Sequence, residues 1–230
     1  MRTGNGRVSL APHENGRESD VRAVVFANGD PPSRQLVSEL ADGADLVVAA
    51  DGGADAALAA GVTPALVIGD LDSLSKAARA SIRRDVIIRD PDPNRTDLQK
   101  AIEACIARGA TEIAVLGTGG GRADHALANL SVLLLYRDRT AIRFVDEQFS
   151  ISVSPGRTSC VGPPGTVVSL VAMGECRGVT TLGLRWDLED ATLPFSPLGV
   201  HNEIRKSPAS IAVQSGDLLV FQGRWVEKHG

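Results

Sequence analysis

The first two-thirds of the chain alternates short, continuously apolar runs with longer segments of mixed polarity. The apolar runs predict strands at residues 21–27, 45–50, 65–68, 86–88, 112–116 and 141–145. The segments between them predict helices over 33–41, 54–60, 75–84 and 96–108, and a long apolar helix that ends at Tyr136. Strands that are apolar on both faces and alternate with helices are typical of a parallel sheet covered on both sides. This part is therefore predicted to be an α/β, Rossmann-like domain with a mainly parallel sheet.

The pattern changes after about residue 146. Short β-rich runs at 150–153, 166–171, 177–181, 211–213 and 218–222 are separated by clusters of Pro, Gly and Ser, and no helix of normal length is predicted. Such spacing is typical of an all-β antiparallel sandwich or open barrel. We expect a disordered leader over residues 1–20, because this stretch is polar and carries charge of both signs. An α/β domain over 21–146 and an all-β domain over 147–230 would follow.

Composition narrows the function classes only slightly. The chain has 230 residues and a net charge of −4, which gives no reason to expect a nucleic-acid partner. No apolar run approaches the roughly 20 residues needed to span a bilayer, so no membrane partner is expected. The chain has three cysteines, Cys105, Cys160 and Cys176, which are widely spaced. An odd number of widely spaced cysteines indicates free thiols in a reducing cytoplasm.

Two aspartates follow the third predicted strand in the segment Val67-Ile68-Gly69-Asp70-Leu71-Asp72-Ser73. Residues i and i+2 share a face wherever the chain stays extended, so Asp70 and Asp72 could point at one spot. Two close carboxylates repel unless a cation sits between them, and oxygen ligands suit Mg²⁺. Alternatively, Asp70 only caps the helix that begins near Ser73.

Polar or glycine-rich clusters follow four of the predicted strands. They are Asn28-Gly29-Asp30, Asp51-Gly52-Gly53, Gly69 to Asp72, and Gly117 to Asp124. In open parallel sheets ligands bind at the carboxyl ends of the strands. The sequence therefore predicts that these four clusters gather on one edge of the sheet and form a single site.

A further acidic residue, Asp97, lies in the segment Asn94-Arg95-Thr96-Asp97-Leu98-Gln99-Lys100. Asp97 would occupy the first turn of a helix, where an anion is favoured by the helix dipole, so a purely structural role is one hypothesis. Lys100 is three residues further along, so a simple ion pair with Asp97 is also plausible. In the functional interpretation Asp97 helps to hold the metal and Lys100 meets phosphate.

Four glycines, Gly117 and Gly119 to Gly121, precede Arg122, Asp124 and His125 between a strand and a helix. Backbone N–H groups in such a loop can approach an anion closely, and the helix N-terminus favours negative charge. Arg122 adds a planar donor fork suited to phosphate oxygens. The alternative is a plain flexible turn, and His125 is as consistent with a structural role. No Gly-Lys-Ser/Thr follows, so the loop is not a Walker motif.

These side chains include carboxylates, an arginine and a lysine but no nucleophile with a partner histidine. Metal-assisted transfer of a phosphate-bearing group fits such an inventory, because this chemistry depends on positioning and charge neutralisation.

The sequence resembles the thiamine pyrophosphokinase family. The resemblance covers most of residues 21–222. It rests on Asp51-Gly52-Gly53-Ala54, Val67 to Ser73, Asn94-x-Thr96-Asp97-x-x-Lys100, Gly120-Gly121-Arg122-x-Asp124-His125-x-x-x-Asn129, Gly183 to Leu188 and Asn202-Glu203. It implies a homodimer in which each chain has a nucleotide-binding catalytic domain and a substrate-binding and dimerisation domain. The reaction it implies is transfer of the diphosphate of ATP to the hydroxyl of thiamine, with release of AMP.

The resemblance also implies roles for individual residues. Asp70, Asp72 and Asp97 would hold Mg²⁺ against the phosphates of the co-substrate ATP, with Asp124 beside them. Lys100 and Arg122 would neutralise charge on the transferred group. The residues implied in ATP binding are Asn28, Gly29, Asp51, Gly52, Thr96, Gly119, Gly120, Gly121 and His125.

For the acceptor, the resemblance implies a site where the β domain of one subunit meets the α/β domain of the other, lined by Trp186, His201 and Asn202. Trp186 would stack on the cationic substrate; a place in the sandwich core is the alternative. The family usually has a small hydroxyl residue where this chain has His201. A diphosphokinase for a different small alcohol is therefore the nearest rival. More distant rivals are a D-x-D glycosyltransferase and a non-catalytic nucleotide- or thiamine-binding module.

Overall fold

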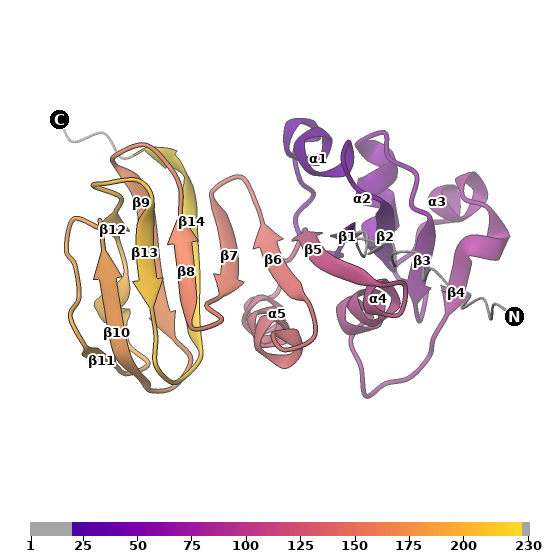
Figure 1. Ribbon diagram of the computed structural model, residues 1–230. Coiled ribbons are helices and arrows are strands. Elements are labelled where there is room, and N and C mark those ends of the chain that lie inside the picture. Colours follow the sequence, from indigo (N-terminus) through magenta and orange to yellow (C-terminus); the bar gives the residue numbers. More distant parts are fainter. Residues whose placement is uncertain (1–19, 227–230) are drawn as a thin grey trace, which may run out of the picture.

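The computed structural model describes residues 20–226, so the predicted leader lies outside the described residues except for Asp20. The predicted alternation of strands and helices is confirmed (Figure 1). In chain order the elements are β1 (Val21–Phe26), α1 (Arg34–Ala41), β2 (Leu46–Ala50), α2 (Gly53–Ala59), β3 (Leu66–Gly69), α3 (Lys76–Ser81), η1 (Arg84–Val86), β4 (Ile87–Arg89), α4 (Asp97–Ile106), β5 (Ala110–Leu116), α5 (Ala123–Tyr136) and β6 (Ala141–Val145).

Strands β1 to β6 form a parallel sheet in the order β6-β5-β1-β2-β3-β4. Strand β1 lies at the centre, and the chain first adds strands on one side of it and then, from β5 onwards, on the other. The order therefore reverses between β1 and β5, and ligands bind outside the carboxyl ends of the strands at such a position.

The continuous apolar character of the strands has the predicted cause, because both faces of the sheet are buried. Alternate residues of β1 enter different cores, since side chains of a strand point to opposite faces. Ala23 and Val25 pack in the core under α4 and α5. Val24 and Phe26 pack in the core under α1, α2 and α3.

Several helix ends fall where the sequence places them. The Ser33 side chain accepts a hydrogen bond from the Leu36 N–H at 3.2 Å, which caps α1. Thr96 and Gln99 form a reciprocal capping box at the start of α4. Gly61 and Gly109 follow α2 and α4 with φ of 87° and 82°, a conformation that favours glycine.

The second part of the chain is a sandwich of two antiparallel layers. Its elements are β7 (Phe149–Val153), β8 (Arg157–Cys160), β9 (Thr166–Ala172), β10 (Cys176–Leu182), β11 (Ala191–Leu193), η2 (Pro197–Gly199), β12 (Asn202–Glu203), β13 (Ala209–Ala212) and β14 (Leu218–Val226). One layer has the order β11-β10-β13-β8, and the other is formed by β12, β9, β14 and β7. Val168 and Leu218 from one layer meet Val179 and Ile211 from the other in the sandwich core.

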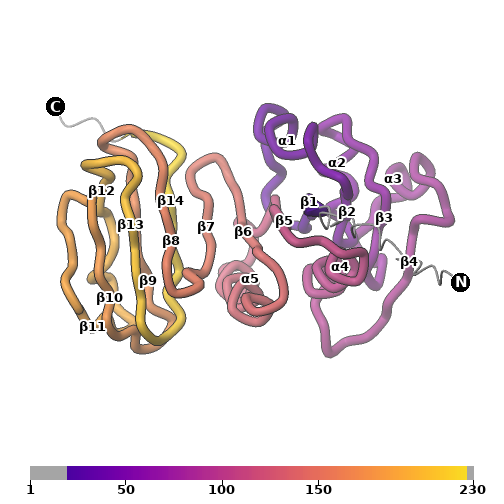
Figure 2. The backbone as a smooth tube through the Cα atoms, viewed as in Figure 1, coloured from indigo at the N-terminus to yellow at the C-terminus, as the bar shows by residue number. Residues whose placement is uncertain are grey.

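The two parts share one sheet, which the sequence did not predict. Strand β7 pairs with β6 on one side and with β14 on the other, so the main sheet runs through ten strands from β12 to β4. Figures 1 and 2 show the consequence, an elongated molecule with the sandwich at one end, the helix-covered parallel strands at the other and β6 and β7 between them. The strand direction changes from parallel to antiparallel between β6 and β7.

Within residues 20–226, none of the helices is long and apolar enough to cross a membrane. The cysteines Cys105, Cys160 and Cys176 are all buried and free.

Candidate active site

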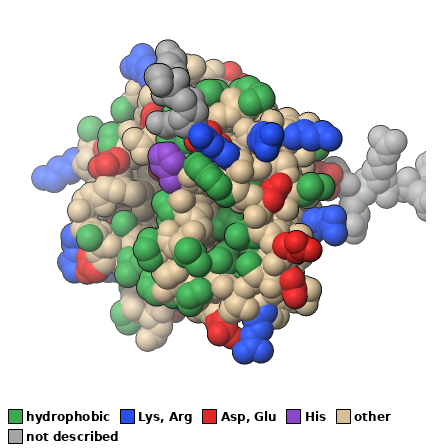
Figure 3. Space-filling view, turned by 90° about the vertical axis from the view of Figure 1, so that its left-hand side faces the viewer, with side chains coloured by type: hydrophobic (Ala, Val, Ile, Leu, Met, Phe, Trp, Pro, Cys, Tyr) green, Lys and Arg blue, Asp and Glu red, His purple; other side chains and the backbone are tan. Residues whose placement is uncertain are grey.

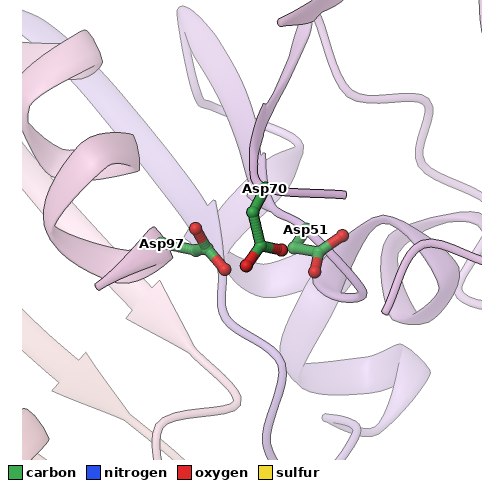
Figure 4. A group of neighbouring side chains, drawn as sticks. All are labelled: Asp51, Asp70 and Asp97. Atoms are coloured by element: carbon green, nitrogen blue, oxygen red, sulfur yellow. The ribbon is translucent and has the colours of Figure 1, made fainter. Parts of the chain in front are cut away.

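Three carboxylates meet beyond the carboxyl ends of neighbouring strands. Asp51 follows β2, Asp70 follows β3 and Asp97 begins α4. Each offers an oxygen atom, and these three oxygens all lie within 4.8 Å of one another. Figure 4 shows the Asp70 carboxylate between those of Asp51 and Asp97. Such an all-oxygen group has the ligand chemistry that Mg²⁺ prefers.

Asp51 is the buried member of this group, with 2% of its surface exposed. Its Oδ2 accepts a hydrogen bond from the Ser73 N–H at 2.9 Å. Its Oδ1 is buried and has no hydrogen-bond partner among residues 20–226. Burial is the main cause that raises the pKa of Asp51; the Ser73 N–H opposes the rise, and the charges of Asp97, Asp72 and Asp70 add to it. A buried anionic oxygen without a partner is costly, and a cation among the carboxylates would remove that cost.

A glycine makes the close approach of these carboxylates possible. A Cβ atom on Gly69 would lie 2.9 Å from the Cβ of Asp51 and 3.0 Å from the Cγ of Asp97. A side chain at this position would therefore push the two acidic residues apart.

Lys100 is buried and faces the group from α4. Its ammonium donates to Asp97 Oδ1 at 2.9 Å and to the backbone carbonyl of Asp90 at 2.7 Å. The ion pair with Asp97, one of the two hypotheses for this residue, is thus confirmed. It holds the Asp97 carboxylate beside that of Asp70.

The prediction that Asp70 and Asp72 share a face is wrong, because the chain is not extended between them. Leu71 has a φ of 68°, in the left-handed region. The Asp72 N–H instead donates to Asp70 Oδ1 at 3.1 Å, and Asp72 Oδ1 accepts from the Ser73 hydroxyl. Asp72 lies outside the three-carboxylate group, and the third member of that group is Asp51 instead of the expected Asp72.

Asp70 is not a helix cap, so that alternative is also wrong. The cap of α3 is Ser75, whose hydroxyl accepts from the Ala78 N–H at 3.0 Å. The Asp70 carboxylate instead accepts the Asp72 N–H and lies beside the other two carboxylates.

The glycine loop after β5 is packed against the end of β1. The Gly29 N–H donates to the Gly117 carbonyl at 2.8 Å, and the Asp30 N–H donates to that of Gly119 at 2.9 Å. A Cβ on Gly29 would lie 2.3 Å from both carbonyl oxygens, so only glycine fits there. The loop is fixed by these bonds, unlike the flexible turn that we considered as an alternative.

The backbone of Gly52 packs equally closely against the side chain of Asn28. A Cβ on Gly52 would lie 2.4 Å from Asn28 Oδ1. The Asn129 side chain donates to the Thr118 carbonyl at 2.9 Å, which ties the glycine loop to α5. Asn28, Gly29, Gly52 and Gly119, all predicted to bind ATP, thus meet around the carboxyl end of β1.

Arg122 and Asp124 form a two-pronged ion pair at the start of α5, with Nη2 and Oδ2 2.6 Å apart. Both side chains are exposed, and neither belongs to the three-carboxylate group. The hydrogen bonds from Arg122 are the main cause that lowers the pKa of Asp124 to about 2. His125 is exposed beside them, whereas Thr96 uses its hydroxyl to cap α4.

The sequence analysis missed Arg95, which organises the loop before α4. Its guanidinium bonds to Asp90 and Asp92, each at 2.9 Å, and to Glu103 at 2.6 Å. Since Lys100 donates to the Asp90 carbonyl, Arg95 helps to fix the surroundings of Asp97. The run of acidic residues and prolines before Arg95 was the available signal.

The residues expected to bind the acceptor lie at the sandwich end. Trp186 is 54% exposed, so the alternative that it belongs to the sandwich core is wrong. Its backbone is held by Asn202, whose Nδ2 donates to the Trp186 carbonyl at 2.7 Å and whose Oδ1 accepts from its N–H. The Arg185 guanidinium carbon lies 4.8 Å from the centre of the indole ring.

His201 is exposed and has a φ of 66°. Its N–H donates to the Ser169 hydroxyl at 2.9 Å. Within one chain these residues are far from the carboxylates, because Trp186 follows β10 and Asn202 begins β12, at the opposite end of the molecule from β2 and β3 (Figure 1).

Two family descriptions match successive parts of the chain. Residues 37–144 match "Thiamin pyrophosphokinase, catalytic domain", and residues 150–218 match "Thiamin pyrophosphokinase, vitamin B1 binding domain". The chain belongs to the thiamine pyrophosphokinase family.

Similar proteins agree with this membership of the thiamine pyrophosphokinase family. The chain is 27% identical to thiamin pyrophosphokinase 1 of Caenorhabditis elegans, over 95% of this chain and 97% of that protein. It is 24% identical to thiamine pyrophosphokinase of Bacillus subtilis, over 88% of this chain and 99% of that protein. Among solved structures, the thiamin pyrophosphokinase of Candida albicans has the same fold, with a TM-score of 0.77 at 17% identity over 90% of each chain.

Proposed function

We propose that this chain transfers the diphosphate group of ATP to the hydroxyl of thiamine, which gives thiamine diphosphate and AMP. As a member of the thiamine pyrophosphokinase family the chain is an enzyme of thiamine diphosphate formation by pyrophosphoryl transfer. ATP as the donor, Mg²⁺ as the cofactor and the roles of individual residues are the further parts of the proposal.

The buried Oδ1 of Asp51 is the observation that carries the proposed metal site. It has no hydrogen-bond partner among the described residues, and the Asp51 carboxylate belongs to the group that it forms with Asp70 and Asp97. Asp51, Asp70 and Asp97 would hold Mg²⁺, with Asp72 beside them, close enough that its charge helps to raise the pKa of Asp51. Bound Mg²⁺ would neutralise charge on the phosphates, the main requirement of phosphoryl-type transfer.

The remaining polar residues of the α/β part would bind and orient the nucleotide. Asn28, Gly29, Gly52 and the glycine loop present backbone at the carboxyl end of β1, where the strand order reverses. Lys100 would keep the Asp97 carboxylate in place and contribute positive charge to the phosphate site. Arg122 would meet phosphate with its guanidinium fork. That contact would release Asp124 from its ion pair and allow it to orient the acceptor hydroxyl.

The acceptor site would be completed by a second copy of the chain. The carboxylates of Asp51 and Asp70 follow β2 and β3, and Trp186 follows β10, which lies at the opposite end of the molecule (Figure 1). A site that uses both therefore needs two chains. Figure 3 shows the sandwich end, where apolar side chains gather near the middle of the surface. The segment between β11 and β12 exposes Phe195, Leu198 and Val200. Exposed apolar side chains in this number favour an interface, and we propose a homodimer.

In this arrangement residues 21–146 form the nucleotide-binding catalytic domain and residues 147–230 the substrate-binding and dimerisation domain. Trp186 would stack on the thiamine cation. The buried free cysteines fit a reducing compartment, and we propose the cytoplasm as the location.

His201 supports a second candidate, a diphosphokinase for a different small alcohol. The residue next to Asn202 is a bulky, titratable side chain in a left-handed conformation, where the family usually has a small hydroxyl residue. The metal and nucleotide sites would be unchanged, and only the acceptor pocket would differ.

Product analysis tests the proposal. Purified protein with ATP, Mg²⁺ and thiamine should release AMP in step with thiamine diphosphate, and Asp70→Asn should abolish the release. Production of ADP would contradict diphosphate transfer. AMP release that needs another small alcohol instead of thiamine would favour the second candidate.

A further inference from the structure

A cavity lies beside the edge strand of the parallel sheet, on the far side of β3 from β2. It has a volume of about 980 Å³ and is bordered by α3, η1 and β4. Its lining consists of Leu71, Lys76, Arg79, Ala80, Ile82, Arg83, Arg84, Ile87 and Arg89. We call this the α3–β4 pocket. Its volume is that of a small-molecule site.

The α3–β4 pocket is strongly basic in an otherwise acidic chain. All five basic residues of the segment 76–89 line it, and the segment has one acidic residue, Asp85, while the whole chain has a net charge of −4. Like charges gathered in this way repel one another, and a bound anion would remove the repulsion.

Most of the cations around the pocket are available to a ligand. Arg83 is paired with Asp85. Among residues 20–226, Lys76 and Arg84 have no ion-pair partner within salt-bridge distance, and neither do Arg79 and Arg89. The last two donate at 3.4 Å to the backbone carbonyls of Leu71 and Asp70. Bonds of this length are weak, so both guanidinium groups could turn to an anion.

The pocket also has an apolar surface, formed by Leu71, Ala80, Ile82 and Ile87. Guanidinium groups bind phosphate oxygens in pairs of hydrogen bonds, and an apolar surface receives a planar ring. We propose that the α3–β4 pocket binds a nucleoside polyphosphate, with the phosphates on the basic side chains and the base on the apolar residues.

This pocket is separate from the proposed catalytic site. The nucleotide residues of that site surround the ends of β1 and β5, and its carboxylates follow β2 and β3. The α3–β4 pocket lies beyond β3 and contains no acidic lining residue. The two sites adjoin at Leu71, which stands between Asp70 and Asp72 in the chain and also forms part of the pocket wall. Binding in the pocket needs no divalent ion and does not rest on the proposed function.

The test is a calorimetric titration of the full-length protein with ADP in EDTA, which removes divalent ions. We expect saturable binding that the double variant Lys76→Glu/Arg84→Glu weakens by about tenfold or more, since it removes two charge-assisted contacts to the phosphates. The control Arg157→Glu/Arg205→Glu makes the same change of charge on exposed residues of the sandwich and should bind ADP like the wild type.

No saturable ADP binding in EDTA, or an equal loss in both double variants, would overturn the proposal. Pyrophosphate is the second probe, because it carries the two phosphates of ADP without the nucleoside; it should bind more weakly than ADP, and equal affinity would exclude a role for the apolar surface. A protein that releases AMP from ATP but binds no ADP in EDTA would retain the proposed function and lose this pocket.

Discussion

The backbone of Gly69 lies against the side chain of Asp97, so that a Cβ on Gly69 would stand 3.0 Å from the Asp97 Cγ and 3.1 Å from its Oδ1. Gly69→Ala should therefore displace Asp97 from the three-carboxylate group. We expect a destabilisation of about 1–3 kcal/mol from overpacking. Activity should fall by about 10²-fold, as expected when reacting groups shift by about 1 Å. Denaturant unfolding and steady-state kinetics measure the two effects.

Gly43→Ala is the matched control, because a Cβ there would meet the Arg22 guanidinium at an ordinary 3.5 Å. It should leave activity unchanged. A Gly69→Ala protein with wild-type kinetics would show that the position of Asp97 is not critical.

Asp51→Asn should stabilise the protein in the absence of metal. Burial raises the pKa of the Asp51 carboxyl above its ordinary value of 3.8. The folded state therefore binds the proton more tightly than the unfolded state, and stability is lost as the pH rises from 3.8 through the raised pKa. At pH 7 the buried charge is a cost, and asparagine removes it while it can still accept the Ser73 N–H.

The melting temperature in EDTA at pH 7 should accordingly rise, by about 2–4 °C for each kcal/mol gained. Addition of Mg²⁺ should raise the melting temperature of the wild type and not that of Asp51→Asn. Asp138→Asn, at a side chain that is 87% exposed, is the control and should behave like the wild type in both conditions. A lower melting temperature of Asp51→Asn in EDTA would mean that this charge is stabilising.

Arg122→Gln should raise the pKa of Asp124. Hydrogen bonds from Arg122 are the main reason why the pKa of this carboxyl is about 2 instead of 3.8. The ion pair is present above the ordinary pKa and is lost as the pH falls towards 2. A carboxyl-carbon NMR titration should show a midpoint near 2 in the wild type and a clearly higher one in Arg122→Gln. Arg157→Gln is the control and should leave the midpoint of Asp124 where it is in the wild type. An unchanged midpoint in Arg122→Gln would show that Arg122 does not lower the pKa of Asp124.

Trp186→Leu should weaken thiamine binding selectively. A cation–π contact contributes about 0.5–2 kcal/mol, so we expect the KM for thiamine to rise by about 2- to 30-fold. The KM for ATP should stay the same. The free energy of unfolding should change little because the indole is 54% exposed. Trp225→Leu, at the other tryptophan, is the control, and an unchanged KM for thiamine in Trp186→Leu would remove Trp186 from the acceptor site.

Local sequence signals predicted the elements of the parallel sheet well. Continuously apolar strands, the caps Ser33 and Thr96 and the stop glycines Gly61 and Gly109 all act within a few residues, so the sequence displays them directly. The pairing of β14 with β7 and β9 joins residues far apart in the chain, and periodicity carries no information about it. Strands β8, β11 and β12 were missed, because β8 is polar except for Cys160 and the other two have only three and two residues.

In the candidate site, too, some features could be predicted from the sequence and others depend on the fold. The rule that ligands gather at the carboxyl ends of parallel strands correctly predicted that Asp51 and Asp70 come together. The rule did not cover Asp97, whose place near the metal was only one of the hypotheses for the start of α4. The left-handed conformation of Leu71 could not be foreseen, because non-glycine residues rarely adopt it. It separates Asp72 from the group and leaves Asp51 as the third carboxylate. Arg95 was missed because its ion pairs with Asp90 and Glu103 depend on the fold of the loop.

Direct binding of a divalent ion decides whether the three carboxylates act together. Mn²⁺ takes the same oxygen ligands as Mg²⁺, and its free form is counted by electron paramagnetic resonance. Titration of the wild type should show saturable binding that Asp51→Asn and Asp97→Asn each weaken by about tenfold or more, whereas Asp138→Asn binds like the wild type. Equal Mn²⁺ affinity in Asp51→Asn and the wild type would contradict a metal site built on the buried carboxylate.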